Sequence, residues 1–286
     1  MKTNRDDAVF YLKNLRDKIV KEFESLEQGQ SFERTPWPYQ NGRGGGEMSV
    51  LRGKVFEKAA VNWSGVYGTH LPGERSQKVS DAKHPETPFF ATGVSLITHM
   101  RNPKAPTVHF NIRYIEKLDV SQNVPSVTSK SPAWWLGGGF DLTPMGFEYS
   151  EDTEHFHSVA KVALESFGTD IYPTFKQNAA QYYYIKHRHR ERGVGGIFFD
   201  YLNTGDRDRD FALWRSVGDH FLETIMPIYK RRIHEPYNDE DRRVQLERRA
   251  HYAEFNLLYD RGTRFGFESG GNPEAILCSM PPLAAW

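Results

Sequence analysis

Two apolar, strand-like runs that follow each other closely, residues 91–99 and 107–116, constrain this chain more than any other feature. The connector between them, RNPKAP (101–106), contains two prolines. Proline is disfavoured inside strands because it cannot donate a ladder hydrogen bond. The two runs therefore predict an antiparallel hairpin.

The rest of the chain mixes helical and strand-like segments without the steady alternation that builds parallel sheets. This pattern favours an α+β fold with one large, mostly antiparallel sheet. No linker-like break interrupts the chain, so residues 1–286 are predicted to form a single domain. Helices are predicted over 9–26, from about 151, over 171–192 and over 208–232. The later predicted strands are 196–202, 252–259 and 275–280. Loops are predicted at 69–88 and 121–132, and a hairpin turn at 269–272.

Charge and cysteine content exclude several classes of protein. Lys plus Arg and Asp plus Glu both number 37, whereas a protein that coats nucleic acid needs a basic excess. The single cysteine, Cys278, excludes an intramolecular disulfide framework and CxxC zinc sites. No run approaches the ~20 apolar residues of a membrane span. The first residues do not resemble a targeting segment, so we expect a cytoplasmic protein.

Alternation along the hairpin groups polar side chains on one face. His109, Asn111 and Arg113 share a face of the second run, and Ser95 and His99 share a face of the first. The alternative is an ordinary solvated sheet face. Such a face usually carries Lys, Glu and Thr, which are absent from these positions. We therefore favour a ligand-binding site there.

Other charged residues offer further candidates, each with a structural alternative. Arg188 and Arg192 share a face if the helix reaches residue 192, and guanidinium groups bind carboxylates bidentately. Cations at the end of a helix are equally well explained by the helix dipole. Asp141 follows three glycines that let the backbone approach a large flat ligand, although it could simply cap a turn. Asp260 and Arg261 could form a turn ion pair.

The histidines raise the possibility of a divalent metal. His99, His109, His157 and His187 could in principle converge. However, the sequence has no HExxH motif and no fixed ligand spacing. The eleven histidines make accidental candidates easy to assemble. A required metal is therefore the less favoured reading.

Eight longer segments together strongly resemble the oxygen-dependent coproporphyrinogen III oxidases of haem biosynthesis. They occur in the order of that family and span nearly the whole chain, which is more specific than any single motif. The segments are GGGEMSVLRGKVFEKAAVNWSGVYG (44–68), GVSLITHMRNP (93–103), PTVHFNIRY (106–114), WWLGGGFDLTP (134–144), EHFH (154–157), YYIKHRHRERGVGGIFFDYLN (183–203), YAEFNLLYDRGTRFG (252–266) and SGGNPEAILCSMPP (269–282).

The resemblance implies one large antiparallel sheet with helices on both faces, assembled as a homodimer. It implies oxidative decarboxylation of two propionates of coproporphyrinogen III to vinyl groups, giving protoporphyrinogen IX. O2 is then the oxidant and no organic cofactor is needed. The zero net charge of the whole chain would then be an average that includes a local arginine-rich cavity for this tetracarboxylate substrate.

The resemblance also implies roles for individual residues. The implied substrate-binding residues are Ser95, Asn111, Arg113, Arg188, Arg192, Arg261, Gly270 and Gly271. The implied catalytic residues are His109 as proton donor, Asp141 and Asp260. A divalent-metal set would fall on His99, His109, His157 and His187. Asn272 departs from the family, which commonly has Arg after the Gly-Gly pair.

The chemistry suggests how these residues would act. A carboxylate that accepts pyrrole N–H bonds, from Asp141 or Asp260, raises the electron density of the pyrrole, which can then donate to O2 directly. His109 is placed for proton transfer. Two alternatives remain: a metal-dependent oxygenase or decarboxylase with a histidine site, and a non-enzymatic porphyrin carrier on the same fold.

Overall fold

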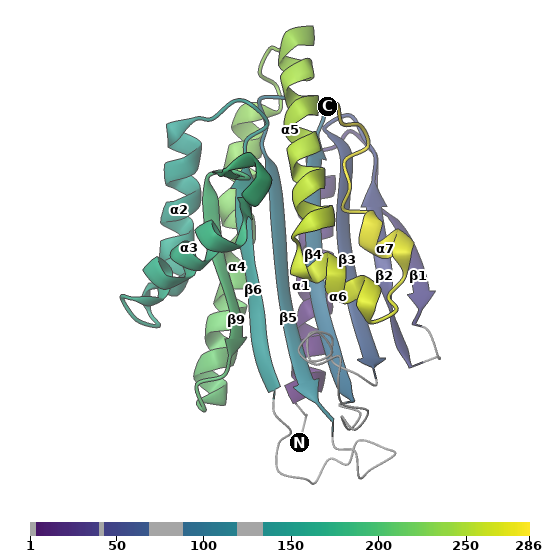
Figure 1. Ribbon diagram of the computed structural model, residues 1–286, viewed down its shortest axis with the longest axis vertical. Helices are drawn as coiled ribbons and strands as arrows, with labels where there is room; N and C mark the ends of the chain where they lie inside the picture. The colour runs from purple at the N-terminus through teal and green to yellow at the C-terminus, as the bar shows by residue number, and fades with distance from the viewer. Residues whose placement is uncertain (1–3, 40–42, 69–87, 119–133) are drawn as a thin grey trace.

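The computed structural model describes residues 4–39, 43–68, 88–118 and 134–286. Its centre is a seven-stranded sheet in the order β1-β2-β3-β4-β5-β6-β9, in which all neighbouring strands run antiparallel (Figure 1). The predicted hairpin is confirmed as β4 and β5. The strands are β1 Glu33–Pro38, β2 Gly44–Leu51, β3 Phe56–Gly68, β4 Phe89–Met100, β5 Thr107–Lys117, β6 Trp134–Thr143 and β9 Gly195–Leu202.

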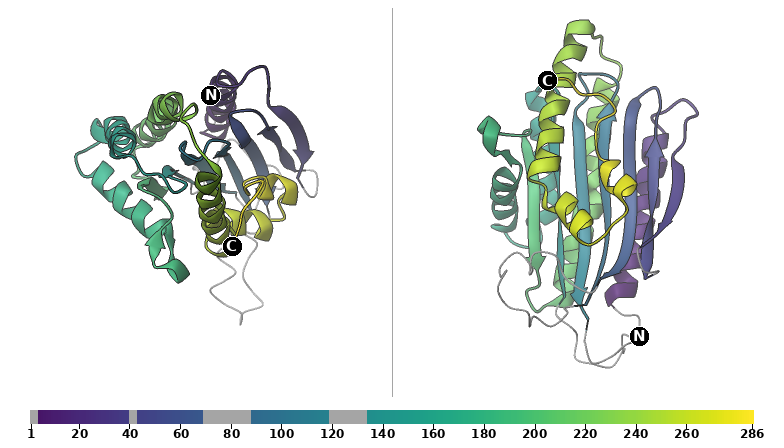
Figure 2. Two further views of the ribbon diagram at one scale, coloured as in Figure 1. Left: turned by 90° about the horizontal axis from the view of Figure 1, so that it is seen from above. Right: turned by 45° about the vertical axis from the view of Figure 1, so that its right-hand side comes forward.

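Helices cover both faces of the sheet, as expected for the α+β class. Seen from above in Figure 2, α1 and α4 lie on one face, and α5, α6 and α7 lie on the other. Helix α3 packs on the edge strand β9, and α2 packs on α4. The helices are α1 Asn4–Glu24, α2 Ser150–Glu165, α3 Ile171–Tyr182, α4 Arg207–Arg232, α5 Asp239–Leu258, α6 Arg261–Glu268 and α7 Pro273–Leu277.

The main hydrophobic core lies between the sheet and the α1–α4 layer. Leu12, Ile19 and Phe23 of α1 are fully buried at the spacing that predicted this helix. On β5, Phe110 points into this layer, with its ring centroid 4.4 Å from that of Phe221 in α4. Because side chains alternate along a strand, His109 and its face-mates point to the opposite side, toward α5–α7.

The last predicted strands are wrong. Residues 252–259 belong almost entirely to α5, and residues 275–280 contain the end of the short helix α7. Residues 269–272 connect α6 to α7 rather than forming a hairpin turn, and the Asn272 side chain caps α7 by accepting from the Ala275 amide at 3.2 Å. Aromatic residues in 252–259 suit strands locally, but the buried positions Gln245, Arg249, Tyr252 and Asn256 recur with the helical period.

The helix predicted over 171–192 is also shorter than expected. It ends at Tyr182, and the chain then forms the two-residue strands β7 (Tyr184–Ile185) and β8 (Arg190–Glu191) around a 3-10 turn, Lys186–Arg188. His189, between the turn and β8, has φ 51°, a left-handed conformation that breaks any helix. The loops predicted at 121–132 and over most of 69–88 lie outside the described residues. None of the helices in the described ranges combines the length and the apolar character that crossing a membrane requires.

Candidate active site

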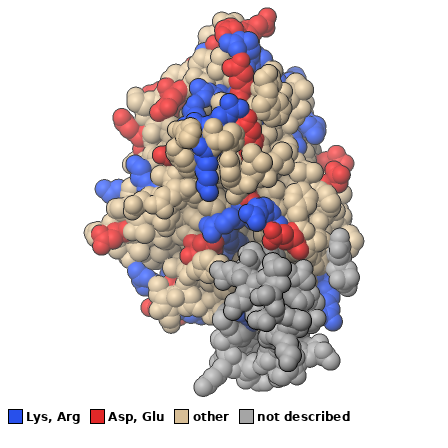
Figure 3. All heavy atoms as spheres, in the orientation of Figure 1, with Lys and Arg blue, Asp and Glu red and all other residues tan. Residues whose placement is uncertain are grey.

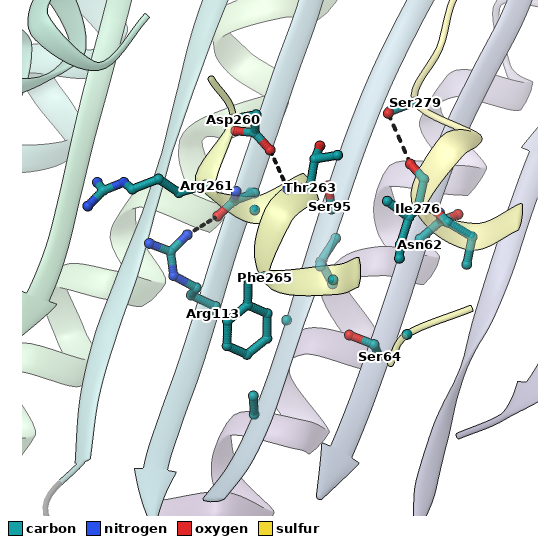
Figure 4. A pocket seen from close by; sticks show the side chains of 18 of the residues that line it. Asn62, Ser64, Ser95, Arg113, Asp260, Arg261, Thr263, Phe265, Ile276 and Ser279 are labelled. Atoms are coloured by element: carbon teal, nitrogen blue, oxygen red, sulfur yellow. Dashed lines mark hydrogen bonds between the residues drawn. The ribbon is translucent and has the colours of Figure 1, made fainter. Parts of the chain in front are cut away.

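A cavity of about 530 Å³ lies between the sheet and the α5–α7 layer. Its floor is formed by the centre of the sheet, and its roof by the end of α5 together with α6 and α7, which cross in front of the strands in Figure 4. On the face that carries these helices, basic side chains gather near the middle, with acidic side chains beside them (Figure 3). The predicted residues Ser95, His109, Asn111, Arg113 and Asp260 all line the cavity.

The strand register explains why these side chains meet. Asn62 of β3 pairs with Ser95 of β4, and Ser95 pairs with Asn111 of β5. These three residues form one row across the floor of the cavity. The next row places His109 opposite Asp141 of β6. The prediction that Ser95, His109, Asn111 and Arg113 lie on one face is therefore confirmed.

Gly137 keeps a space open at one end of this floor. A Cβ atom there would lie 2.8 Å from Asp200 Oδ1 and 2.9 Å from Arg113 Nε. Contacts this short do not occur between real Cβ atoms and their neighbours, so the glycine makes room for an ion pair that spans three strands. Arg113 Nη2 and Asp200 Oδ2 are 2.8 Å apart, and Arg113 also donates to Asn111 Oδ1 at 3.2 Å.

Asp260 and Arg261 complete the charged end of the cavity. In Figure 4 they lie on the same side as Arg113, whereas Asn62 and Ser64 lie on the opposite side. Asp260 caps α6 by accepting from the Thr263 amide at 2.6 Å. The cavity therefore has one charged end and one neutral polar end.

Charge balance in the cavity differs from the expectation. Among the described lining residues, the arginines are matched in number by carboxylates, so the cavity is not rich in net positive charge. The cations are Arg113, Arg261 and Arg264, and the anions are Asp200, Asp260 and Glu268. Any gain in binding a polyanion therefore comes from how the arginines are aimed, not from an excess of them.

On the same face of the sheet as His109, Asp141 joins this histidine to a buried arginine. Asp141 is fully buried and does not line the cavity. Its carboxylate accepts from Arg192 Nε at 2.8 Å and Arg192 Nη2 at 2.5 Å, and it lies 3.1 Å from His109 Nδ1. Burial alone would raise the pKa of Asp141, but the Arg192 guanidinium outweighs this and lowers it to about 2.

This arrangement fixes the orientation and tautomer of His109. An ionised carboxylate can only accept, so Nδ1 of His109 carries the proton that bonds to Asp141. The other ring nitrogen, Nε2, is then free for the cavity, which His109 lines. The geometry is that of a histidine held by a buried acid for proton transfer.

The two predicted arginines of the 183–203 segment separate. Arg192 is buried against Asp141, whereas Arg188 lies outside the cavity and pairs with Glu254 at 2.5 Å. The prediction that they share one helix face is wrong, because the helix ends at Tyr182. Of the remaining predicted residues, Arg261 and Gly271 line the cavity, and Gly270 adjoins it in sequence.

The four histidines do not form a metal site. No group of three or more His, Cys, Asp or Glu side chains in the described ranges is arranged to hold a metal ion. His99 bonds to the Ser279 carbonyl at 2.9 Å, and His157 bonds to the Val194 carbonyl at 2.9 Å. His187 bonds to Glu254 at 2.7 Å, outside the cavity. The four rings bond to different parts of the chain and are not gathered around one point, so these residues do not fit a shared ion.

Sequence reasoning missed several residues near the cavity, among them Asp200, Asn256 and Tyr182. Asp200 could have been found, because it lies two residues after Phe198 in the correctly predicted strand 196–202 and therefore shares its face. Asn256 was hidden by the incorrect strand prediction over 252–259. Tyr182 contacts Asp260 from a segment 78 residues away, and no local pattern reports such a contact.

Comparison with known proteins shows which family the chain is similar to. Residues 8–286 match the coproporphyrinogen III oxidase family. Two proteins from Coxiella burnetii, strains Dugway 5J108-111 and RSA 493 / Nine Mile phase I, are 46% identical over 280 residues, covering 96% of this chain and 86% of theirs; both are described as oxygen-dependent coproporphyrinogen-III oxidases. A protein of the same description from Rickettsia bellii (strain RML369-C) is 42% identical over 294 residues, covering 100% of this chain and 99% of its own.

Proposed function

The chain belongs to the coproporphyrinogen III oxidase family, and we propose that the cavity between the sheet and α5–α7 binds coproporphyrinogen III. The protein is an oxidoreductase that uses O2. It converts two propionate side chains of coproporphyrinogen III to vinyl groups, giving protoporphyrinogen IX, a step of haem biosynthesis.

The two ends of the cavity suit different parts of this substrate. The macrocycle carries carboxylates at its periphery and pyrrole N–H groups at its centre. Arg113 and Arg261 supply guanidinium groups for carboxylates, and Ser95 and Asn111 add neutral hydrogen bonds along the floor. Asp260 lines the cavity with a carboxylate that can accept pyrrole N–H bonds. Asp141 is the weaker candidate for that task, because it is fully buried, does not line the cavity and has its charge paired with the Arg192 guanidinium.

Each decarboxylation must balance as a two-electron oxidation. One propionate, one O2 and one proton give a vinyl group, CO2 and H2O2. The electrons of the breaking C–C bond form the new double bond. A hydrogen and its electron pair leave the carbon attached to the pyrrole and reduce O2. A pyrrole whose N–H is held by Asp260 is more electron-rich and stabilises this loss, and His109 Nε2 supplies the proton to the reduced oxygen.

The observation that carries this assignment is the His109–Asp141–Arg192 group. His109 of this group lines the same cavity whose other end is formed by arginines and carboxylates. The test is O2 consumption and vinyl formation with coproporphyrinogen III, using protein treated with a chelator. We expect one O2 consumed for each vinyl group formed. Binding of the tetracarboxylate without O2 consumption would instead support the carrier, and activity that returns only with added metal would support the metal-dependent oxygenase.

We also propose that the protein works as a homodimer in the cytoplasm and without an organic cofactor. These proposals rest on the family resemblance. The relatives are described as oxygen-dependent, which supports the proposal that O2 serves as the oxidant and that no organic cofactor is needed for this task. Light scattering and absorption spectra of the purified, active protein test the oligomeric state and the cofactor content.

A further inference from the structure

The hydroxyl group of Tyr182, the last residue of α3, lies between Asp260 and Arg261. It donates to Asp260 Oδ1 at 2.8 Å and accepts from the Arg261 backbone amide at 3.1 Å. A single oxygen thus ties the end of α3 to the first residues of α6. Both residues that it holds line the cavity.

The ring of Tyr182 is fixed as firmly as its hydroxyl group. It stacks on Phe198 of β9, with ring centroids 4.0 Å apart and planes 5° from parallel. The Arg261 guanidinium lies 4.9 Å from the centroid of the Tyr182 ring and 5.3 Å from that of Phe198. The Tyr182 ring therefore stabilises the Arg261 guanidinium by a cation–π contact, and the Tyr182 hydroxyl group holds the backbone amide of Arg261.

The other contacts of these two residues leave a role for the hydroxyl group. The Arg261 side chain is 55% exposed, and its ion pair with Asp200 is long, at 3.9 Å. On Asp260, one oxygen is used by the Thr263 amide and the other by Tyr182. Burial raises the pKa of Tyr182 further above the working range, so the hydroxyl group remains a neutral donor.

We propose that Tyr182 is a positioning residue for the oxidation: it sets the Asp260 carboxylate and the Arg261 guanidinium at the distance and angle that one bound tetrapyrrole requires. Asp260 then meets the pyrrole N–H groups while Arg261 meets a peripheral carboxylate. The proposal rests on the proposed function. Tyr182 acts through its two neighbours and does not itself contact the reacting atoms.

The test is a double-mutant cycle on vinyl formation with Tyr182→Phe and Asp260→Asn. Tyr182→Phe keeps the stacked ring and removes only the hydroxyl group. We expect it to lower kcat by about tenfold in the wild-type background, but by no more than about threefold when Asp260 is already Asn, because most of the effect passes through that carboxylate and only the bond to the Arg261 amide remains to be lost.

Tyr11→Phe provides a matched control. Tyr11 also donates to a carboxylate, Asp219 Oδ1, at 2.9 Å, but it does so on the opposite face of the sheet. It should shift the melting temperature to a similar extent as Tyr182→Phe and leave kcat unchanged in both backgrounds. A purely structural role for Tyr182 would give the same pattern as Tyr11.

The outcomes separate this proposal from the proposed function. An equal loss of kcat in both backgrounds, or no loss at all, overturns the role of Tyr182. If the wild type forms no vinyl product, the proposed function fails, and the same cycle is then measured on the Kd of coproporphyrin III by fluorescence quenching. Non-additive changes in Kd uphold the positioning role, and additive changes overturn it.

Discussion

At the scale of single residues, Asp141 links the wall of the cavity to the interior of the protein. Its exposed fraction is zero, and its charge is balanced by Arg192, which is itself buried and lies over the ring of Tyr183 with 4.3 Å between the guanidinium carbon and the ring centroid. A buried ion pair is costly to desolvate and contributes little net stability. The ion pair is better explained by its effect on His109: it keeps the Asp141 carboxylate ionised and in place, 3.1 Å from His109 Nδ1, and so fixes the orientation of the imidazole ring.

Asp141→Asn is therefore expected to lower kcat by about 100-fold with little change in KM, because the side chain orients the proton donor but does not line the cavity. Steady-state kinetics of vinyl formation measure both constants. Asp152→Asn is the matched control: Asp152 is also a buried aspartate paired with arginines, Arg231 and Arg232, but it lies on α2. It should reduce stability and leave kcat intact. A kcat for Asp141→Asn within threefold of wild type would contradict the assignment.

At the scale of elements, the end of α5 contributes Tyr252 and Asn256 to the roof of the cavity, and the helix is fixed to the sheet by a buried arginine. Arg249 is fully buried and donates to Glu57 Oε2 at 2.8 Å and to the Met100 carbonyl at 2.8 Å. Arg242, two turns earlier, donates to the other oxygen of Glu57 at 2.7 Å. One carboxylate on β3 therefore determines where α5 lies.

Glu57→Ala is expected to lower the free energy of unfolding by about 3 kcal/mol or more, since it leaves the Arg249 charge buried without a carboxylate to balance it. Urea unfolding followed by circular dichroism measures the loss. Glu240→Ala, on α5 itself, removes an exposed pair with Arg243 and should leave the free energy of unfolding nearly unchanged, because solvent screens such a pair. Equal losses in the two variants would show that Glu57 does not anchor the helix.

The same helix shows where prediction from sequence reaches its limit. The β4–β5 hairpin was predictable because strand alternation and the proline-rich connector are local signals. The end of α5 was not predictable in this way. The aromatic residues of 252–259 favour a strand, and the helical spacing of the buried residues becomes visible only when the preceding residues of α5 are included. Contacts such as Asp141 with Arg192 depend on which strands become neighbours, and spacing along the sequence does not report this. The family motifs located these residues without indicating that Arg188 would face away from the cavity.

At the scale of the whole molecule, a buried histidine makes stability depend on pH. His99 is completely buried on β4, beneath Tyr252 of α5, and bonds to the Ser279 carbonyl. Burial, chiefly, and the nearby Arg249 and Lys58 charges lower the pKa of His99 to about 3. The unfolded chain therefore binds a proton at His99 below about pH 6.5, whereas the folded protein does not until about pH 3.

The free energy of unfolding should consequently fall as the pH decreases from about 6 to 4, and His99 alone contributes a slope of about 1.4 kcal/mol per pH unit. Asp141 adds to the loss only at lower pH, because its lowered pKa stabilises the fold above the ordinary value of 3.8 and ceases to do so as the pH falls toward about 2. Urea unfolding of wild type and His99→Gln at several pH values separates the two. Removing the histidine should flatten the curve between pH 6 and 4 and leave the steeper loss below pH 4, whatever the variant costs at neutral pH. Parallel curves over the whole range would show that His99 titrates alike in the folded and unfolded chain.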